Sequence, residues 1–286
     1  MSPRVSVVIP AHNAAETLRA QLDAVRRQSC AEPFEIVVVD NASTDATPDL
    51  LAEVAALDAR VRSIRATDAR GPSYARNVGV AAAAGDIIVC CDADDIVADG
   101  WLAAMVAALA RAEIVAGVLA VDELNDTTIV AARGGSIPGR AGDFFGVAFP
   151  HGANMGFHRS TYLDVGGLDE RLPAGEEIDL AIRLAGRGVR VVEVPDAVVE
   201  YRYRDDPKAQ WNQAFEGGRV KPHLCRAARR AGLARPGRFQ GARNWLWLVR
   251  SLPQRRDPVV ATRWRWVLAS RCGQIAGCWR HRTVYL

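Results

Sequence analysis

The run FEIVVVD at residues 34–40 sets the expectation for the fold, because it is short, almost wholly apolar and rich in β-branched side chains. Similar runs, each predicting a strand, occur at residues 5–10 (VSVVIP), 61–66 and 86–91 (DIIVCC). Segments of helical period lie between them, at residues 14–28, 47–57 and 72–84. This alternation predicts an α/β fold, in which a mostly parallel sheet is flanked by helices on both faces.

The second part of the chain has a looser pattern. Its expected elements are helices at 100–112 and 176–187, strands at 114–121, 189–194 and 198–203, and a glycine-rich loop at 133–142. From residue 206 onward the sequence is helical in period and rich in Arg and Trp. From residue 201 the chain carries 19 Lys and Arg against 4 Asp and Glu, which leaves 17 against 29 before it, although the net charge is only +3. Such a split predicts a globular domain with a basic, surface-seeking appendage.

The six cysteines form no C-x-x-C pair and show no spacing typical of disulfides or zinc sites. Cys90 and Cys91 fall within an apolar run, so we expect small buried thiols and a reducing environment. The first apolar run indicates a strand rather than a signal segment, and no apolar stretch is long enough to span a bilayer. A cytoplasmic protein is therefore expected.

Three carboxylates, Asp92, Asp94 and Asp95, directly follow the expected strand at 86–91. Ligands of open α/β sheets bind beyond the carboxyl ends of the strands. Carboxylates crowded there repel one another unless a cation neutralises them, and their hard oxygens suit Mg²⁺ or Mn²⁺, which in turn bind diphosphate oxygens. The alternative is that these residues only cap the helix that follows.

Polar groups also end two other expected strands. They are Pro10, Ala11, His12 and Asn13 after the first strand, and Asp40, Asn41, Ser43 and Asp45 after the second. Arg76, beside Asn77, lies in the middle of an expected helix, where a buried arginine needs an anionic partner. Turn chemistry explains any one such group, but three polar strand ends in one sheet indicate a site for a nucleoside diphosphate.

Four motifs, VSVVIPAHN (5–13), VVVDNASTD (37–45), ARNVG (75–79) and DADD (92–95), resemble the ordered series of family 2 glycosyltransferases. The resemblance covers residues 4–204 and implies the Rossmann-like GT-A fold, a nucleoside diphosphate sugar donor and a divalent metal ion, Mg²⁺ or Mn²⁺. It predicts a catalytic domain at 1–204, with a nucleotide-binding half at 1–98 and an acceptor-binding half at 99–204. Residues 205–286 remain as a basic, Trp-rich helical region.

Carried over residue by residue, the resemblance implies a set of positions that bind the donor. They are Pro10, Ala11, His12, Asn13, Asp40, Asn41, Arg76, Asn77, Asp92, Ala93 and Asn154. Asp94 resembles the direct metal ligand, and Asp92 resembles a residue that faces the ribose or a metal-bound water. His12 replaces an aromatic residue often found at its position.

Glu200 lies near the place of a His that approaches the metal or diphosphate in related proteins, so it is a candidate oxygen ligand. Arg202 and Arg204 alternate along an expected strand and are candidates for contact with the leaving diphosphate. The alternative for both arginines is a solvated strand edge.

The segment GEEID at residues 175–179 opens a helix and resembles the part of the family that supplies the catalytic base. A base is needed because a sugar hydroxyl is a poor nucleophile until its proton is removed. The family has Glu-Asp or Asp-Asp there, with the second carboxylate as base, so Glu177 is the first choice although it is one methylene longer than Asp. Glu176 and Asp179 remain candidates, and an acidic first turn of a helix is the purely structural alternative.

In the C-terminal region, apolar residues recur at helical spacing with arginines beside them. They are Trp264, Leu268, Cys272, Ile275 and Trp279, with Arg263, Arg265, Arg271, Arg280 and Arg282. Such a stripe suits a helix lying on an anionic membrane surface, and a helix packed on the catalytic domain is the alternative. No fold for binding nucleic acid is recognisable, so no such partner is expected.

Together these features predict an inverting, metal-dependent glycosyltransferase located in the cytoplasm, with the basic region at the inner face of the plasma membrane. The donor is expected to be UDP-linked, and the acceptor hydroxyl belongs to a glycan, a lipid-linked molecule, a small molecule or a peptide. The alternative from another class is a catalytically silent protein of the same fold that binds a sugar nucleotide or a partner. Sequence motifs for dinucleotides, P-loop nucleotides and serine hydrolases are absent.

Overall fold

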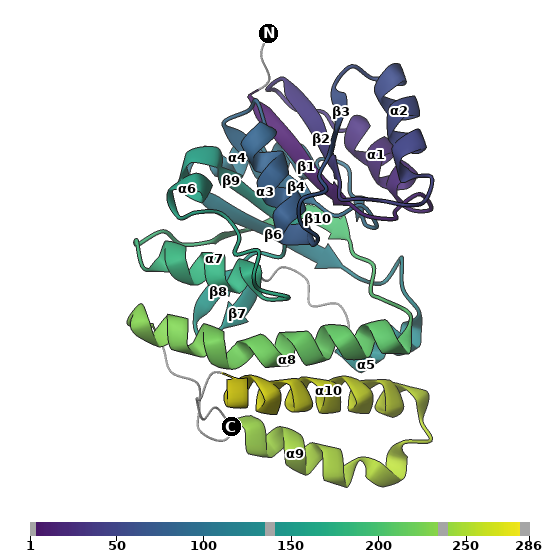
Figure 1. Cartoon of the computed structure of the whole chain (residues 1–286), viewed down its shortest axis with the longest axis vertical. Coiled ribbons are helices and arrows are strands. Elements are labelled where there is room, and N and C mark those ends of the chain that lie inside the picture. Colours follow the sequence, from purple (N-terminus) through teal and green to yellow (C-terminus); the bar gives the residue numbers. More distant parts are fainter. Residues whose placement is uncertain (1–3, 135–140, 234–239, 281–286) are drawn as a thin grey trace.

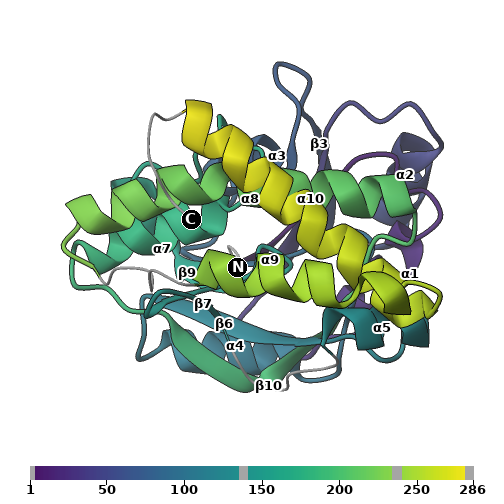
Figure 2. The same cartoon turned by 90° about the horizontal axis from the view of Figure 1, so that it is seen from below.

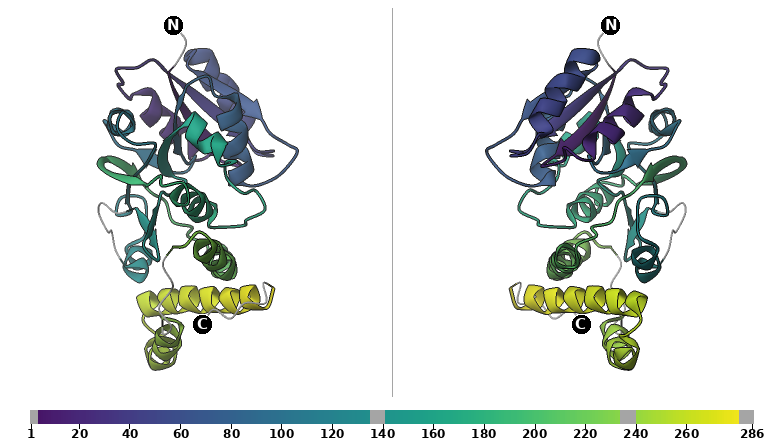
Figure 3. Two further views of the ribbon diagram at one scale, coloured as in Figure 1. Left: turned by 90° about the vertical axis from the view of Figure 1, so that its left-hand side faces the viewer. Right: turned by 90° about the vertical axis from the view of Figure 1, so that its right-hand side faces the viewer.

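The computed structural model describes residues 4–134, 141–233 and 240–280. Its centre is a mixed sheet with the strand order β3-β2-β1-β4-β9-β6-β10-β5 (Figure 1). These strands are β1 (Val5–Ala11), β2 (Phe34–Asp40), β3 (Val61–Arg65), β4 (Ile87–Cys91), β5 (Ile96–Val97), β6 (Ile114–Ala120), β9 (Asn154–His158) and β10 (Val192–Glu200). Helices cover both faces, as Figure 3 shows from two sides, and the prediction of an α/β fold is confirmed.

The first four long strands run parallel, with β1 between β2 and β4 and with β3 outside β2. Alternate side chains of β1 enter two separate cores, since Val7 faces one and Val8 faces the other. One core lies under α1 (Leu18–Arg26), α2 (Thr47–Leu57) and α4 (Trp101–Leu109). The other lies under α3 (Pro72–Ala82), α6 (Arg159–Asp164) and α7 (Glu176–Ala185). Burial on both faces is why these strands are apolar along their whole length.

Three local details differ from the sequence expectation. Helix α1 begins at Leu18 rather than at residue 14, because the N–H groups of Ala14 and Ala15 donate to side chains of the loop after β2. Strand β9 is antiparallel to both of its neighbours, β4 and β6. The two strands expected at 189–194 and 198–203 form the single strand β10, whose pairing with β6 shifts between Val194 and Val198. Pro195 lies within that irregularity, where its missing N–H breaks no ladder bond.

The C-terminal region consists of α8 (Pro207–Arg230), α9 (Gln240–Arg250), a short 3-10 turn (Leu252–Gln254) and α10 (Pro258–Arg280). Figure 2 shows α10 lying across α8, with α9 on the outer side. Glycines allow this close crossing, because a Cβ atom at Gly218 or Gly273 would collide with the backbone of Ser270 or Phe215. Backbones therefore touch where α8 and α10 cross.

Helix α8 is also joined to the rest of the molecule. It shares a buried apolar cluster with α7 and with the hairpin of β7 (Gly142–Phe144) and β8 (Val147–Phe149), in which Ile182 and Leu224 take part. Helix α10 contacts α5 (Thr127–Arg133), where the Arg133 guanidinium lies 3.1 Å from the centre of the Trp266 ring. The C-terminal helices thus form a layer packed against the sheet domain.

This packing changes the expectation for the apolar stripe of α10. Trp264 is half-buried and donates to the carbonyl of Leu248 on α9, and within the stripe only Ile275 and Trp279 are exposed. Arg282 and most of the predicted loop at 133–142 lie outside the described residues. Within the described ranges, no helix combines the length and the apolar character that a membrane crossing requires.

Candidate functional site

The loops that follow β1 and β2 are bonded to each other at one edge of the sheet. The N–H of Asn13 donates to Ser43 Oγ at 2.9 Å, and Asn13 Oδ1 accepts from the N–H of Thr44 at 2.8 Å. Asp40, almost fully buried, accepts from the N–H of Ser43. Turn chemistry of the expected kind therefore does shape these loops, and it fixes the backbone of the strand ends Pro10 to Asn13 beside Asp40.

Asn41 extends this arrangement toward α3. Its amide group donates to the carbonyls of Ala66 and Ala69 and accepts from the N–H of Gly71, while its backbone carbonyl is 2.7 Å from His12 Nδ1. Its side chain is fully used within the protein, so Asn41 positions the segment that leads into α3.

Asp92, Asp94 and Asp95 come together after β4, and each offers one carboxylate oxygen within 4.8 Å of the others. Burial, and then the charge of Asp92, raise the pKa of Asp94. Burial, Asp92 and Asp94 raise the pKa of Asp95 to about 9. Asp95 Oδ2 is buried and has no hydrogen-bond partner among the described residues. Crowded hard oxygens with an unpartnered one among them fit a divalent cation, which Asp94 and Asp92 would hold.

The segment after β10 brings positive charge to the same group. The backbone N–H of Arg202 donates to Asp95 Oδ1 at 2.8 Å, and its Nε donates to the carbonyl of Asp94 at 3.0 Å. The charges of Arg204 and Arg202 also act on Asp94, in the direction that lowers its pKa. Both predicted arginines therefore lie near the acidic strand end.

Arg76 links the acidic strand end to the start of α7. Its side chain is only 4% exposed, donates to Asp92 and lies 3.9 Å from Glu176 Oε1. Burial opposes the charge of this guanidinium, but Asp92, Glu177 and Glu176 together raise the pKa of Arg76. Gly79, one turn further along α3, packs without a side chain against Val8 of the sheet and so allows α3 to lie this close. The expectation that a buried arginine needs an anionic partner is met at this position.

Helix α7 presents its two leading glutamates to Arg76. Glu177 Oε1 accepts from the N–H of Gly152 at 3.0 Å. A Cβ atom at Gly152 would lie 2.6 Å from Arg76 Cζ and 2.7 Å from Glu177 Oε1, so only glycine leaves room for the two side chains to converge. Burial, and then the charge of Glu177, raise the pKa of Glu176 to about 7.

Two predicted site residues have other partners. Asp179 is paired with Arg183 at 2.7 Å, and Asn77 bonds the backbone of Leu168 through both ends of its amide. Asn77 thus holds the loop that precedes α7 directly, and Asp179 does so through Arg183, which donates to the carbonyls of Val165 and Gly167. Glu200 is not part of the group formed by Asp92, Asp94 and Asp95. Burial, and then the charges of Glu123 and Asp122, raise the pKa of Glu200.

Asn154 makes its hydrogen bonds within the sheet and with α4. This residue is fully buried in β9, where its side chain accepts from Trp101 Nε1 and donates to the carbonyls of Val118 and Ala197. Asn154 pairs with Cys91, the last residue of β4, and its role in donor binding stays a prediction.

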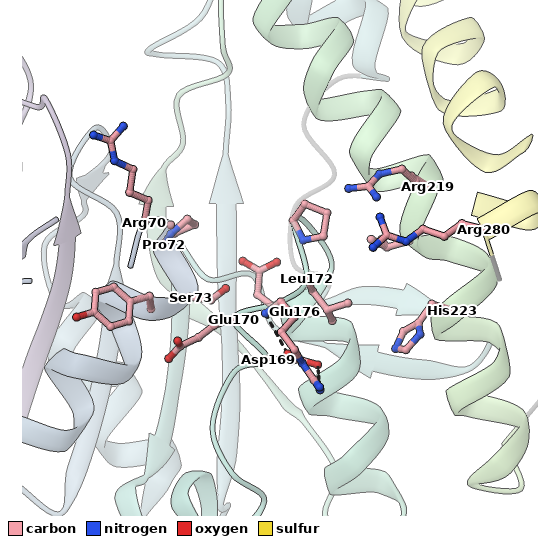
Figure 4. Close-up of a pocket in the computed structure, with 15 residues that line it drawn as sticks. Arg70, Pro72, Ser73, Asp169, Glu170, Leu172, Glu176, Arg219, His223 and Arg280 are labelled. Carbon is pink, nitrogen blue, oxygen red and sulfur yellow. Dashed lines mark hydrogen bonds and ion pairs between the residues drawn. The ribbon is translucent and has the colours of Figure 1, made fainter. Parts of the chain in front are cut away.

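Sequence reasoning missed two features of the site. Gln21 is buried on the apolar face of α1 and donates to the backbone carbonyl of Asp92, which fixes the strand end from the opposite face of the sheet. A lone polar residue among Leu18, Leu22 and Val25 was the available signal. The second feature is a cleft of about 510 Å³ beside Glu176, drawn in Figure 4, whose far wall comes from α8 and α10.

Residues 6–166 match the sequence model of glycosyl transferase family 2. The chain belongs to this family. It is 39% identical over 123 residues to the succinoglycan biosynthesis protein ExoO of Rhizobium meliloti, a match that covers 43% of the chain and 34% of that protein. It is 27% identical over 263 residues to the pre-mycofactocin glycosyltransferase of Mycobacterium tuberculosis, covering 87% of the chain and 53% of that protein. The chain thus spans between a third and about half of the length of these relatives.

Solved structures of other proteins share the fold. The mannosyltransferase PcManGT from Pyrobaculum calidifontis, in complex with GDP-Man and Mn²⁺, aligns with a TM-score of 0.66 at 21% identity, over 96% of this chain and 88% of that one. S. aureus TarS 1-349, in complex with UDP-GlcNAc, aligns with a TM-score of 0.55 at 15% identity, over 99% and 93%. The family resemblance and the GT-A fold predicted from the sequence are confirmed.

Proposed function

We propose that this family 2 chain transfers a sugar from a nucleoside diphosphate sugar, which we take to be UDP-linked, to the hydroxyl group of an acceptor. The transfer inverts the anomeric configuration of the sugar and depends on a divalent cation. The observation that carries the proposal is the convergence, across buried Arg76, of an acidic strand end and the two glutamates that open α7. The acidic strand end can hold a cation and the glutamates can accept a proton. A direct sugar transfer requires both. Structural neighbours described with GDP-Man and Mn²⁺ and with UDP-GlcNAc support this type of donor and metal.

The roles follow from the contacts. When bound, Mg²⁺ or Mn²⁺ neutralises the charge that grows on the departing diphosphate. Asp94, with Asp92, would hold the cation, and Arg202 and Arg204 would add positive charge beside it. Glu177 takes the proton of the acceptor hydroxyl on the face opposite the leaving group, so the anomeric configuration inverts.

Arg76 has a positioning role in this proposal. It carries the buried positive charge that lets Asp92 and the two glutamates lie near one another without a large repulsion. Gly152 fixes one oxygen of Glu177 through its N–H, so the other oxygen is the one that would take the proton. The nucleotide would lie along residues 10–13 and Asp40, with Ala93 between the two metal-side aspartates.

A catalytically silent protein that binds a sugar nucleotide is the second candidate. It is favoured by one observation, the glutamate at position 177 in place of the usual aspartate. The two candidates differ in turnover of the bound donor in the presence of a metal ion. The proposed acceptors are a glycan, a lipid-linked molecule, a small molecule or a peptide.

We further propose that the outer face of α9 and the turn after it lie on an anionic membrane surface at the cytoplasmic side. Four large apolar side chains are exposed there, Trp245, Leu246, Val249 and Leu252. Four exposed arginines accompany them, Arg243, Arg250, Arg255 and Arg256. Apolar side chains flanked by arginine match the chemistry of an anionic lipid interface.

The metal and donor part of the proposal is tested by calorimetric titration of UDP with and without Mn²⁺. We expect Asp94→Ala to abolish the Mn²⁺ dependence of UDP binding, because the variant removes a cation ligand. Asp86→Ala, an exposed aspartate at the opposite end of β4, is the matched control and should keep that dependence. UDP affinity that gains nothing from Mn²⁺ in the unmodified protein, or that keeps its full dependence in Asp94→Ala, would show that the assignment is wrong.

A further inference from the structure

The cleft beside Glu176 has walls from distant parts of the chain (Figure 4). One wall is the first turn of α3 and the preceding Arg70, and the floor includes residues 169–173 and Glu176. The far wall is formed by Arg219 and His223 of α8 and by Arg280 of α10. Its volume of about 510 Å³ lies within the usual range for sites that bind small molecules.

The close crossing of α8 and α10 puts two arginines on that far wall. Gly277 of α10 packs directly on the backbone of Arg219. Arg280 lies three residues beyond Gly277 and therefore on the same face of α10. His223 follows Arg219 by one turn of α8, so all three side chains border the same space.

The acidic residues around the cleft are mostly engaged elsewhere. Asp169 is held by Arg171 through two bonds of 2.8 Å, and Glu170 accepts from Asn77. Arg219 is bonded to Glu216, which lies outside the cleft.

Two arginines that line the cleft are not paired with any described acidic side chain. Among the described residues, Arg70 and Arg280 form no ion pair, and Figure 4 shows the guanidinium groups of Arg219 and Arg280 on the same side of the cleft. Two guanidinium groups on the same side of a cleft repel each other unless solvent or an anion lies between them. The far wall is therefore suited to an anion.

We propose that this cleft binds a phosphate group carried by the acceptor. A phosphate offers several oxygens and can accept bonds from side chains on two helices at once, whereas a carboxylate is matched by a single guanidinium fork. Glu176 lines the same cleft, and Glu176 and Glu177 both lie close to the buried Arg76, so an acceptor anchored at Arg219 and Arg280 has its hydroxyl groups close to the proposed base. This inference rests on the proposed function and adds the chemical class of the acceptor.

The test uses inorganic phosphate as the probe, titrated calorimetrically into the full chain in EDTA, so that no cation site takes part. We expect the double variant Arg219→Gln/Arg280→Gln to bind phosphate at least about tenfold more weakly, since charge-assisted hydrogen bonds are lost. Arg111→Gln removes the same charge from an exposed position at the end of α4 and should leave phosphate affinity unchanged. Arg280→Gln alone, at an exposed position, gives an intermediate loss and covers the case in which the double variant does not fold.

Competition experiments then distinguish the source of the phosphate. Displacement of the probe by a water-soluble sugar phosphate supports a soluble acceptor, and stronger displacement by a short-chain isoprenyl phosphate in detergent supports a lipid-linked one. Equal phosphate affinity of the unmodified protein, Arg280→Gln and the double variant overturns the inference, as does failure of both competitors. UDP binding with Mn²⁺ is measured on the same preparation of the unmodified protein. Its absence counts against the proposed function, while its presence with unchanged phosphate binding counts only against the phosphate site.

Discussion

The acidic strand end and the C-terminal helices are both rich in charge, but they hold that charge differently. At the strand end charges of both signs are crowded together around the buried Arg76, which contacts Asp92 and lies near Glu176. In the C-terminal region most arginines are exposed, and two of them lie over aromatic rings, as Arg255 does over Trp264. A buried charge costs free energy unless its partners are in place, whereas an exposed one costs almost none. Buried charges therefore point to a function more strongly than exposed ones do.

The most direct way to sharpen this comparison is to remove one carboxylate charge beside Arg76 without changing the shape of its side chain. We expect Glu177→Gln to lower turnover by roughly two to four powers of ten while UDP still binds, because a general base is lost. Glu32→Gln, in the exposed loop before β2, is the control and should keep normal turnover. Donor consumption is measured at saturating donor with Mn²⁺.

The pH profile identifies the outcome that would contradict this assignment. Burial, and then the charge of Glu177, raise the pKa of Glu176 to about 7, and only the ionised carboxylate can accept a proton. If Glu176 is the base, turnover rises through about pH 7, and Glu176→Gln rather than Glu177→Gln causes the large loss. Near-normal turnover in both variants would move the role of base to Asp179, whereas no donor turnover by the unmodified protein would favour the silent binder.

The fold of the first half could be predicted because its information is local. Apolar runs such as residues 34–40 and 86–91 become buried strands whatever their neighbours are. The carboxyl ends of β1, β2 and β4 meet because these parallel strands share one edge of the sheet. The aspartates at 92, 94 and 95 lie at that edge. The hydrogen bond between Asn154 and Trp101 could not be predicted, because the two residues lie 53 positions apart and no spacing rule reports such a contact.

The C-terminal region could not be predicted to the same depth, since its contacts are made between helices. The sequence shows an Arg-rich and Trp-rich helical stretch, but the glycines at 218, 273 and 277 give no sign of which backbone they touch. The cleft beside Glu176 exists only because these glycines bring α10 onto α8. A helical pattern alone leaves a packed layer and a membrane-bound helix equally open.

Neighbouring glycines of α8 give a matched test of whether the C-terminal helices are part of the folded unit. A Cβ atom at Gly218 would collide with the Ser270 backbone, whereas one at Gly217 would meet nothing. We expect Gly218→Ala to lower the free energy of unfolding by roughly 1–3 kcal/mol through overpacking. Gly217→Ala should raise it by up to about 1 kcal/mol through helix propensity. Chemical denaturation measures both, and equal shifts would indicate that α8 and α10 do not cross as closely as described.

The smallest expected effect concerns the exposed face of α9. Deleting the C-terminal region cannot test it cleanly, because removal of α8 would also uncover the buried cluster that includes Ile182. A surface substitution avoids this problem. Leu246, 50% exposed on α9, and Leu57, 67% exposed at the end of α2, offer the same side chain on different surfaces.

We expect the unmodified protein to co-sediment with vesicles of anionic lipid at low salt and to bind neutral vesicles weakly. Each arginine near an anionic surface contributes about 1 kcal/mol, and salt screens that attraction over about 8–10 Å at ordinary ionic strength. Leu246→Ser removes one partly inserted apolar side chain, a loss of about 1 kcal/mol that weakens vesicle binding roughly fivefold. Leu57→Ser should leave vesicle binding unchanged, since Leu57 ends α2 and Figure 1 shows α2 at the opposite end of the molecule from α9. The membrane proposal fails if the two variants bind anionic vesicles equally, or if the unmodified protein does not bind them at low salt. The exposed arginines of this region are then solvated, and its helices serve only to pack against the sheet domain and to close the cleft beside Glu176.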